Sequence, residues 1–549
     1  MEQQLRKIWE EQEEKIAQSL AEILGLPYIN LNYTFINPET GKIVNLEELK
    51  NASAVIFWRD AHKIKIGVID PKKPETEKLI EELKQKNYQV EIYIISQNSL
   101  NKALKDLEEF ENRKTLSSYI SVLTLNKSLI EKIKNEISSL GDVDKVIKEY
   151  DSPNRGYDIL EIIFAAVNVL KPSDVHLEPQ KDFVVVRFRI DGILHEVSNL
   201  SYNSYQILKN RLKLLSGMKL TFKKIAQDGR FSLDLGEKIL EVRSSLIPGD
   251  YDESFVLRIL DPEVAKFPLE KLGFREEDLE IVKRNLLQPN GMILVTGPTG
   301  SGKTTTLYSF IHQIASPTIK IITLEDPIEY KIPGIQQTQV NPKSGYTFAS
   351  GLRAILRQDP DVILVGEIRD EETAQIAITA ALTGHLVIST LHTNNSLGAI
   401  PRLVNLKVKR DLIPPALRLV IAQRLVRKVC QLCTQFIDPQ PNLKERIMKE
   451  LETIPKEIKS KIPEDFKVPK IVGCKNCNFL GYKGRIGIFE MFEMSLDLEE
   501  VILKDPSEQN IWNSLKDKGF VTLLQDGLLK VIFHQTSLEE LTRVVGFIL

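Results

Sequence analysis

Residues 291–306 read GMILVTGPTGSGKTTT and carry the most specific pattern in the chain. The apolar run at 292–295 predicts a buried strand, and residues 297–304 after it have the spacing G-x-x-x-x-G-K-[ST]. Glycines let backbone N–H groups close around phosphate oxygens, and a helix that begins near Thr304 directs its positive end toward them. The order strand, loop, helix therefore predicts a phosphate-binding loop rather than an ordinary glycine-rich turn.

The side chains of this loop suit a nucleoside triphosphate with its Mg²⁺ ion. The Lys303 ammonium is long enough to reach the outer phosphates, and the Thr304 hydroxyl is a suitable Mg²⁺ ligand. We therefore predict an ATP and Mg²⁺ site formed by Gly297, Pro298, Thr299, Gly300, Ser301, Gly302, Lys303, Thr304 and Thr305.

The composition of the whole chain limits the class of protein. Its 549 residues suffice for about three or four domains. Lys and Arg total 73 and Asp and Glu total 75, so no excess of positive charge indicates a nucleic-acid or anionic-membrane binder. No stretch approaches the ~18 apolar residues of a membrane span, and the charged N-terminus is unlike a signal peptide. We expect a cytosolic protein whose membrane contact is peripheral.

Composition and periodicity divide the chain into five parts. They predict a small N-terminal α/β docking domain, a helical linker, a second α+β domain, a further linker and a motor domain, at 1–110, 111–154, 155–262, 263–273 and 274–549. An apolar-periodic helix before residue 24 is expected to pack on the N-terminal domain. The motor part includes a zinc-binding segment at 426–490 and a helical C-terminal tail.

Five arginines of the second domain lie in or beside predicted strands, where a solvated charge is less expected. They are Arg187, Arg189, Arg230, Arg243 and Arg258. In VVVRFRI the arginines alternate with apolar residues, which fits the solvent face of a sheet. The alternative is that some of them reach the phosphates of a nucleotide as arginine fingers. Both interpretations stay open, with Arg230 and Arg243 as the preferred fingers.

Strands and helices alternate after the phosphate loop, which predicts a mostly parallel sheet with helices on both faces and ligands at the carboxyl ends of its strands. Two strands end in acids there: TLEDPIEY brings Glu325, with Asp326 and Glu329, and DVILVGEIRD brings Glu367. We predict that Glu367 activates the water that attacks the γ-phosphate, and that the Glu325 group binds Mg²⁺ through water or positions the attacking water. Asp370 has the simpler role of a helix cap.

Two histidines, His385 and His392, lie at the two ends of the next predicted strand. Residues seven apart on a strand are ~23 Å from end to end and point to opposite faces, so this pair cannot bind one metal ion. We expect hydrogen-bonding roles, with one of the two sensing the phosphates or a neighbouring subunit.

The four cysteines form two C-x₂-C pairs separated by 40 residues. Two such pairs can present four thiolates to one Zn²⁺ ion at ~2.3 Å, and four protein ligands leave no position open for catalysis. We therefore predict a structural zinc site at Cys430, Cys433, Cys474 and Cys477. Disulfides are the alternative, but a reducing cytosol disfavours them.

Four segments of the motor domain resemble the sequence boxes of the secretion ATPase superfamily. GPTGSGKTTT, TLEDPIEY, GLRAILRQDPDVILVGEIRD and TGHLVISTLHTN are similar to its Walker A, Asp, Walker B and His boxes. The second domain is similar in SDVHLEP, VRFRIDG, QDGRF and FVLRILD, so the resemblance covers roughly residues 155 to 549. The branch that assembles type IV pili or powers type II secretion is the most similar, because it has the two cysteine pairs that pilus-retraction ATPases lack.

This resemblance implies a RecA-like motor domain and a PAS-like α+β domain in a hexameric ring, with ATP between the two domains. The arginines of the family are matched by Arg230, Arg243, Arg353 and Arg357, and His392 is assigned to the nucleotide. The implied enzyme is an ATP hydrolase that drives protein transport in pilus assembly or type II secretion. Its implied partners at the inner face of the cytoplasmic membrane are an integral platform protein and a membrane-anchored docking protein.

Two other functions are compatible with a phosphate loop. One is a nucleic-acid translocase, but near-neutral charge and the lack of an aromatic-rich strand-binding module disfavour it, so we expect no stable nucleic-acid partner. The other is a nucleotide-binding regulatory subunit without turnover, which the acids Glu325 and Glu367 oppose.

Overall fold

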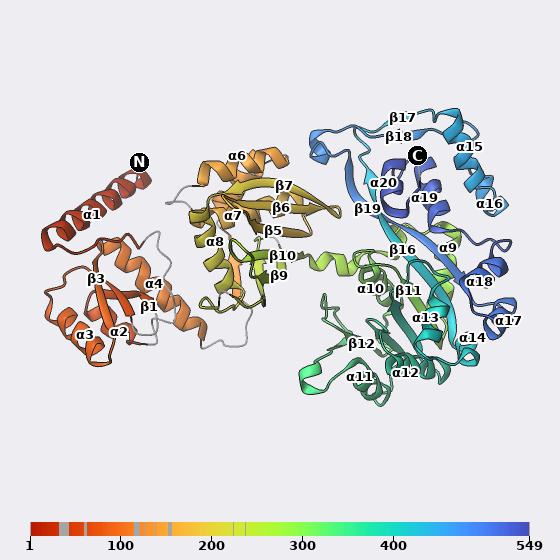
Figure 1. The fold of residues 1–549 in the computed structure, drawn as a ribbon, viewed down its shortest axis with the longest axis horizontal. Coiled ribbons are helices and arrows are strands. Elements are labelled where there is room, and N and C mark those ends of the chain that lie inside the picture. The colour runs from red at the N-terminus through yellow and green to blue at the C-terminus, as the bar shows by residue number, and fades with distance from the viewer. Residues whose placement is uncertain are drawn as a thin grey trace.

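The computed structural model describes residues 2–31, 43–59, 63–114, 121–125, 127–137, 139–151, 156–222, 224–236 and 238–547. The N-terminal, second and motor domains follow one another along the long axis of the molecule (Figure 1). Each domain has its own sheet and its own apolar core. Within the described ranges, no helix combines the length and the apolar character that a membrane span requires.

The motor domain with its cysteine-bearing segment contains the largest set of elements. They are α9 (Glu276–Leu286), β11 (Gly291–Thr296), α10 (Lys303–Ile314), β12 (Ile321–Glu325), β13 (Gln336–Gln339), α11 (Phe348–Leu356), β14 (Val362–Val365), α12 (Glu371–Leu382), β15 (Leu386–Leu391), α13 (Ala399–Asn405), α14 (Ile413–Ala416), β16 (Leu417–Val429), β17 (Gln435–Ile437), α15 (Pro441–Glu450), α16 (Lys456–Lys459), β18 (Val468–Lys470) and β19 (Tyr482–Glu493). The C-terminal tail follows as α17 (Leu496–Lys504), α18 (Glu508–Leu515), α19 (Leu523–Ile532) and α20 (Leu538–Val545).

The motor sheet has the strand order β13-β12-β14-β15-β11-β16-β19. Every neighbouring pair is parallel except β16 with β19, which confirms the mostly parallel sheet. Strands β11, β14 and β15 are buried along their whole length, because helices cover both faces of the sheet and leave no polar side to alternate with the apolar one.

The second domain is an α+β domain with four helices on one face of a sheet. Its elements are β4 (Ser121–Thr124), α5 (Lys127–Glu136), α6 (Leu140–Tyr150), α7 (Gly156–Leu170), β5 (Asp174–Pro179), β6 (Val184–Ile190), β7 (Ile193–Leu200), α8 (Tyr202–Leu215), β8 (Gln227–Asp234), β9 (Ile239–Ile247) and β10 (Ser254–Leu260). The strand order is β4-β8-β9-β10-β5-β6-β7, antiparallel except for β4 with β8. Phe164 of α7 and Phe231 of β8 meet edge to face between the helices and the sheet.

The structure corrects the helical linker predicted at 111–154. Strand β4 pairs with β8, and Leu123, Ile133, Val143 and Ile147 are buried in the core of the second domain. Residues 121–151 therefore belong to that domain wherever they are described. Positions 115–120, 126, 138 and 152–155 of the predicted linker lie outside the described residues.

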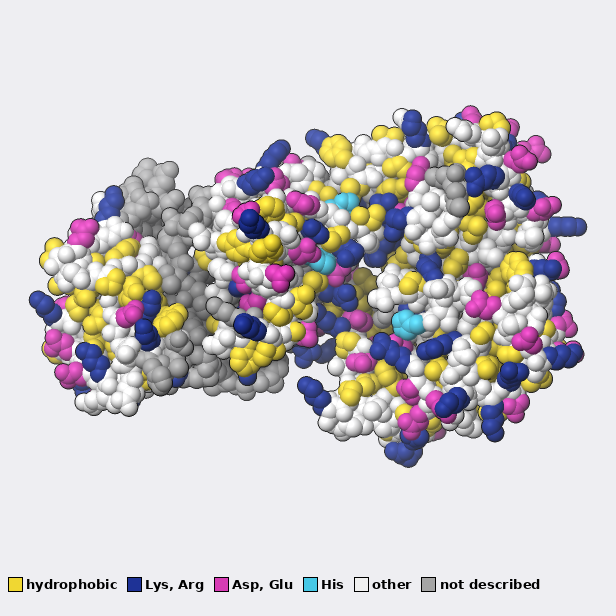
Figure 2. All heavy atoms as spheres, in the orientation of Figure 1, with side chains coloured by type: hydrophobic (Ala, Val, Ile, Leu, Met, Phe, Trp, Pro, Cys, Tyr) yellow, Lys and Arg dark blue, Asp and Glu magenta, His cyan; other side chains and the backbone are white. Residues whose placement is uncertain are grey.

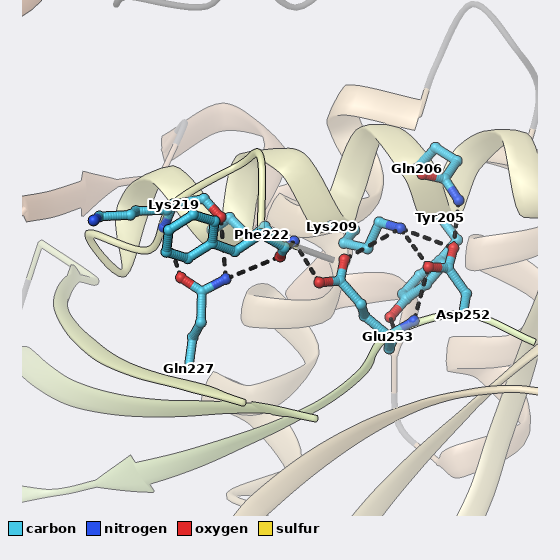
Figure 3. A network of polar contacts seen from close by, with 9 residues as sticks. Tyr205, Gln206, Lys209, Lys219, Phe222, Gln227, Asp252 and Glu253 are labelled. Atoms are coloured by element: carbon cyan, nitrogen blue, oxygen red, sulfur yellow. Dashed lines mark hydrogen bonds and ion pairs between the residues drawn. The ribbon is translucent and has the colours of Figure 1, made fainter. Parts of the chain in front are cut away.

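Buried ion pairs fasten α8 to the loop between β9 and β10 of the second domain (Figure 3). Lys213 Nζ lies 2.6 Å from Glu253 Oε1, and Lys209 Nζ lies 2.6 Å from Asp252 Oδ1. The side chains of both lysines and of Glu253 are at most 5% exposed. Gln227 extends the network, because its amide donates to two carbonyl oxygens of the loop before β8.

The N-terminal domain contains α1 (Glu2–Leu24), α2 (Leu46–Asn51), β1 (Ala54–Arg59), β2 (Lys63–Val68), α3 (Pro74–Gln85), β3 (Gln89–Ile94) and α4 (Gln97–Lys114). Strand β2 pairs antiparallel with β1 and parallel with β3. Helix α1 packs on this domain, as expected: Ala17 and Ala21 are buried, and Leu20 and Leu24 pack against the core. Its large apolar residues Ile16 and Ile23 are 69% and 81% exposed.

Candidate nucleotide site and cysteine cluster

A cavity of about 450 Å³ lies where the second domain meets the motor domain. Residues 299–305 of the glycine-rich loop form one wall, and the carboxyl ends of β12, β14 and β15 bring Glu325, Glu367 and His392. Arg258 of β10 contributes from the second domain. Figure 2 shows Lys, Arg and His side chains along the boundary between these domains. The structure thus brings the predicted loop and acids together and adds a wall from another domain.

The loop between β11 and α10 has the backbone conformation of a phosphate-binding turn. Gly302 caps α10 with φ 90°, and Gly297 has φ 146°, in the region that favours glycine. A Cβ atom on Gly297 would lie 2.6 Å from the carbonyl oxygen of Gln423 on β16, so a larger residue does not fit. The first N–H groups of α10 have no partner within their own helix and can bind phosphate oxygens.

Lys303 lies in the first turn of α10 and bonds the loop that precedes it. Its Nζ donates to the carbonyl oxygens of Gly297 at 2.8 Å and Pro298 at 3.1 Å. Burial lowers the pKa of Lys303, and the nearby Glu367 carboxylate acts in the opposite direction. Thr304 lines the same wall, where its hydroxyl suits the predicted Mg²⁺ ligand.

Glu367 follows β14 and meets the cavity with its carboxylate oriented by two neighbours. Arg369 Nε lies 2.7 Å from Glu367 Oε2, and His392 Nε2 lies 3.1 Å from the same oxygen. The Glu367 side chain is 13% exposed. Both neighbours engage the same oxygen, and the Glu367 side chain lines the cavity.

Glu325 ends β12 and is held more tightly. The hydroxyls of Tyr308 and Thr323 and the amide of Gln337 all donate to its carboxylate, which is buried. Burial raises the pKa of Tyr308 and the Glu325 carboxylate adds to that effect, so the tyrosine stays a donor. The two strand-end acids therefore differ: Glu325 is fixed by three donors and Glu367 is open to the cavity.

Three neighbouring residues have structural roles. Asp370 caps α12 by accepting a backbone N–H at 2.8 Å, which confirms the predicted helix cap. Asp361 accepts a backbone N–H just before β12 at 2.6 Å. His385 Nδ1 lies 3.1 Å from a carbonyl oxygen at the end of α12, and the other end of β15 carries His392 to the cavity. The two histidines are thus separate, as their spacing predicts.

Four arginines of the second domain lie in one row across its sheet. The register places Arg230 opposite Arg243, and Arg243 opposite Arg258. Asp174 follows in the row, between Arg258 and Arg189. Residues directly opposite each other on neighbouring strands share a face of the sheet. This face is opposite the one that the helices cover.

The row approaches the motor domain at two of its members. Arg243 Nη1 lies 2.8 Å from Glu329 Oε2, and Arg258 lines the cavity with a side chain that is 57% exposed. Arg230 is exposed and lies outside the cavity wall. Arg187 pairs with a carboxylate of its own sheet at 3.2 Å. Of the five arginines, Arg258 lines the cavity, and the two preferred fingers, Arg230 and Arg243, do not. Their finger role stays a prediction.

Arg353 and Arg357, which the resemblance assigns to the nucleotide, lie outside the cavity of this chain. Arg353 on α11 pairs with Glu372 at 2.6 Å, and Arg357 donates to the Arg353 carbonyl oxygen at 3.0 Å. Both side chains are exposed. Their nucleotide role stays a prediction.

Arg369 and Arg485 line the cavity although no sequence pattern singled them out. The position of Arg369 two residues after Glu367 was an available signal. Arg485 reaches the cavity because β19 pairs antiparallel with β16, which no local pattern reveals. The adjacent N–H of Gly484 donates to Asp191 Oδ2 at 2.8 Å, so this strand also contacts the second domain.

The cysteines converge at the ends of β16 and β19. Sγ atoms lie 3.8 Å apart in the pairs Cys430–Cys474, Cys433–Cys477 and Cys474–Cys477, and all four lie within 4.8 Å of one another. Tetrahedral zinc–sulfur bonds of ~2.3 Å place sulfurs ~3.8 Å apart, so the cluster has the size and donor set of a zinc site. All four thiols are free, and their spacing exceeds the ~2 Å of a disulfide, so the disulfide alternative is wrong.

Comparisons with known proteins show the family of this chain. A family model described as "Type II/IV secretion system protein" matches residues 157–543. Type II secretion system protein E of Pectobacterium carotovorum subsp. carotovorum is 41% identical over 447 residues, which cover 80% of this chain and 86% of that protein. Type IV pilus assembly ATPase PilB of Myxococcus xanthus (strain DK1622) is 34% identical over 565 residues, which cover 99% and 96% of the two chains.

A solved structure supports the fold. The ATPase DotB of Yersinia pseudotuberculosis superposes with a TM-score of 0.51 at 21% identity, covering 71% of this chain and 92% of that one. The extent of the family match and the identity to both relatives establish the affiliation. This chain belongs to the family of type II/IV secretion ATPases, which are ATP hydrolases.

Proposed function

We propose that this chain forms a hexameric ATPase that converts ATP hydrolysis into motion of the second domain relative to the RecA-like motor domain. This motion would drive assembly of a type IV pilus or of a type II secretion pseudopilus. The observation that carries the proposal is the cavity built by both domains. A nucleotide that fills this cavity contacts both domains. Its hydrolysis therefore changes the contacts that hold the two domains together.

Each group around the triphosphate has a distinct proposed role. The backbone of residues 297–305 and the Lys303 ammonium bind the phosphates, and Thr304 supplies a Mg²⁺ ligand. Glu367 accepts a proton from the attacking water, because its carboxylate is oriented and still open to the cavity. Glu325, fixed by three donors, keeps the end of β12 in place beside the phosphates.

Lys303→Ala is expected to abolish ATP turnover, because it removes the ammonium that neutralises the outer phosphates. Steady-state phosphate release measures this loss. Lys343→Ala, which changes an exposed lysine of the same domain, is the matched control and should keep wild-type turnover. Wild-type turnover in Lys303→Ala would contradict the proposed site.

Glu367→Gln is expected to retain bound ATP and to hydrolyse it about 10²- to 10⁴-fold more slowly, since the amide cannot accept the proton. Gel filtration after loading with labelled ATP measures retention, and phosphate release measures turnover. Glu464→Gln changes an exposed acid and serves as the control. Unchanged hydrolysis in Glu367→Gln would exclude this residue as the base.

The names of the relatives support the proposed setting of this motor. We place it peripherally at the inner face of the cytoplasmic membrane, where it acts on an integral platform protein while its N-terminal domain binds a membrane-anchored protein. Light scattering of the full chain with ATP should give the molar mass of six copies. Added DNA should leave ATP turnover unchanged. A monomer in every nucleotide condition would contradict the ring.

The four cysteines are proposed to hold one structural Zn²⁺ ion, as their sulfur spacing supports. Elemental analysis of the purified chain should give about one zinc per chain. Cys477→Ser should lower the zinc content, and Ser460→Ala, outside the cluster, should not. A zinc-free chain with four intact thiols would refute the site.

A further inference from the structure

Asp174, the first residue of β5, occupies the centre of the arginine row. Its Oδ1 lies 3.1 Å from Arg258 Nε, and its Oδ2 lies 3.4 Å from Arg189 Nε. The hydroxyl of Ser173 donates to Oδ2 at 2.9 Å. The Asp174 side chain is 9% exposed, whereas that of Arg258 is 57% exposed. One buried carboxylate therefore holds an arginine whose other end lies open to the cavity.

The register explains why a carboxylate is needed at this position. Arg258 has Arg243 opposite it on one side and Asp174 on the other, with Arg189 one strand further. Like charges directly opposite each other in a sheet are destabilising. Without Asp174, the guanidinium of Arg258 would lie between two cations and would turn away from the row.

The atoms used by this pair leave the rest of Arg258 available. Asp174 engages Nε, and among the described residues no acceptor bonds the two Nη groups. The Nη groups of arginine form a planar fork that binds phosphate oxygens in a bidentate manner. The Arg258 side chain lines the same cavity as residues 299–305 of the phosphate loop.

We propose that Asp174 is a positioning residue for ATP turnover: its carboxylate holds Arg258 by Nε so that the Nη fork faces the phosphates in the cavity. This inference rests on the proposed ATP site. Asp174 itself does not touch the nucleotide, and its whole effect passes through Arg258.

The test is a double-mutant cycle in the full chain, with kcat and KM from phosphate release and affinity from a fluorescent ATP analogue. Asp174→Asn keeps the size of the side chain and removes its charge, so it should lower kcat/KM by about ten- to hundredfold. Arg258→Ala should lower it at least as much. The combination of both should equal Arg258→Ala alone, because the carboxylate has nothing left to position.

Glu161→Gln is the matched control. Glu161 pairs with Arg211 at 3.3 Å on the helix-covered side, so breaking this pair should leave turnover unchanged. Arg258→Lys keeps the charge without the fork and should lose about tenfold in kcat/KM, which tests the inference even if Asp174→Asn fails to fold.

Two results would overturn the inference: additive losses in the cycle, or wild-type turnover in Arg258→Ala or Arg258→Lys. Each of these leaves the ATP site standing as long as Lys303→Ala is inactive. Turnover in Lys303→Ala would instead contradict the proposed function.

Discussion

Paired charges lie on both sides of the sheet in the second domain, yet the pairs differ in burial and in what they contact. On the helix-covered side, Lys209 and Lys213 of α8 are buried and pair with Asp252 and Glu253 of the same domain. Figure 3 shows Lys209 beside Asp252. On the opposite face, Arg243 and Arg258 are partly exposed and reach the motor domain or the cavity. The buried charges hold a loop of the domain in place. The partly exposed charges remain available to bind a ligand.

Burial explains this difference. A buried ion pair has lost its hydration, so removing one partner leaves a charge that nothing compensates. A partly exposed pair keeps water as an alternative partner, so its loss costs little folding stability. Mutations on the helix-covered face should therefore act on stability, and those on the open face on turnover.

The largest expected effect is on the helix-covered face. Glu253→Gln leaves the Lys213 ammonium buried without a counter-charge and should reduce stability by about 3–5 kcal/mol. Hydrogen exchange of α8 and β10, together with denaturant unfolding, would measure it. Glu91→Gln breaks the exposed pair with Lys65 and should cost less than about 1 kcal/mol.

If Glu253→Gln kept its stability and lost turnover, the division between the two faces would be wrong. If instead the fraction that stays folded binds ATP with wild-type affinity, the network serves the fold alone.

Arg243→Ala should give the second-largest effect. It removes the 2.8 Å pair with Glu329, which lines the cavity, and should lower kcat about tenfold with little change in stability, since the two side chains are 27% and 26% exposed. Phosphate release and a thermal melt separate these outcomes. Glu329→Gln should reproduce the loss in part, because the carbonyl oxygen of Ile328 still accepts from Arg243. A lower melting point with unchanged kcat would instead show that the Arg243 pair serves folding stability rather than turnover.

Local sequence patterns were sufficient for the parts of the site that one stretch of chain builds. The glycine spacing at 297–304 predicted the loop, and acids that end apolar strands predicted Glu325 and Glu367 at the cavity. The open face could not be assigned in the same way. Arg258 and Asp174 lie 84 residues apart in the chain and meet only through strand register.

Long-range pairing also explains the error at 111–154. The pairing partner of β4 at residues 121–124 begins at Phe231, so a short polar-flanked strand looked like part of a linker. Helix α1 shows a related limit. Its spacing identified the helix, but it did not show that Ile16 and Ile23 are exposed while the small residues Ala17 and Ala21 are buried.

Acid should weaken the helix-covered face in a defined pH range. Burial alone would raise the pKa of Asp252, but Lys209 and the backbone N–H of Glu253 hold it below its ordinary value of 3.8. A carboxylate of this kind stabilises the folded state above pH 3.8, and the contribution is lost as pH falls through the lower folded-state pKa. Unfolding midpoints between pH 6 and pH 3 should show this loss, and Asp252→Asn should reduce the dependence. An unchanged slope in that variant would assign the acid sensitivity to other groups.

Arg230→Ala should give the smallest effect and tests how far the row extends. Arg230 is exposed and two strands away from Arg258, so within one chain its removal should change turnover by less than about twofold and stability by less than about 0.5 kcal/mol. Arg243→Ala, one strand closer, is its internal comparison. Turnover measured on the assembled protein decides whether Arg230 has no part in turnover or acts on the nucleotide of a neighbouring chain. A loss as large as that of Arg243→Ala would mean that Arg230 acts on the nucleotide of a neighbouring chain, as an arginine finger supplied from outside the subunit, because no position within its own chain brings it to the cavity wall.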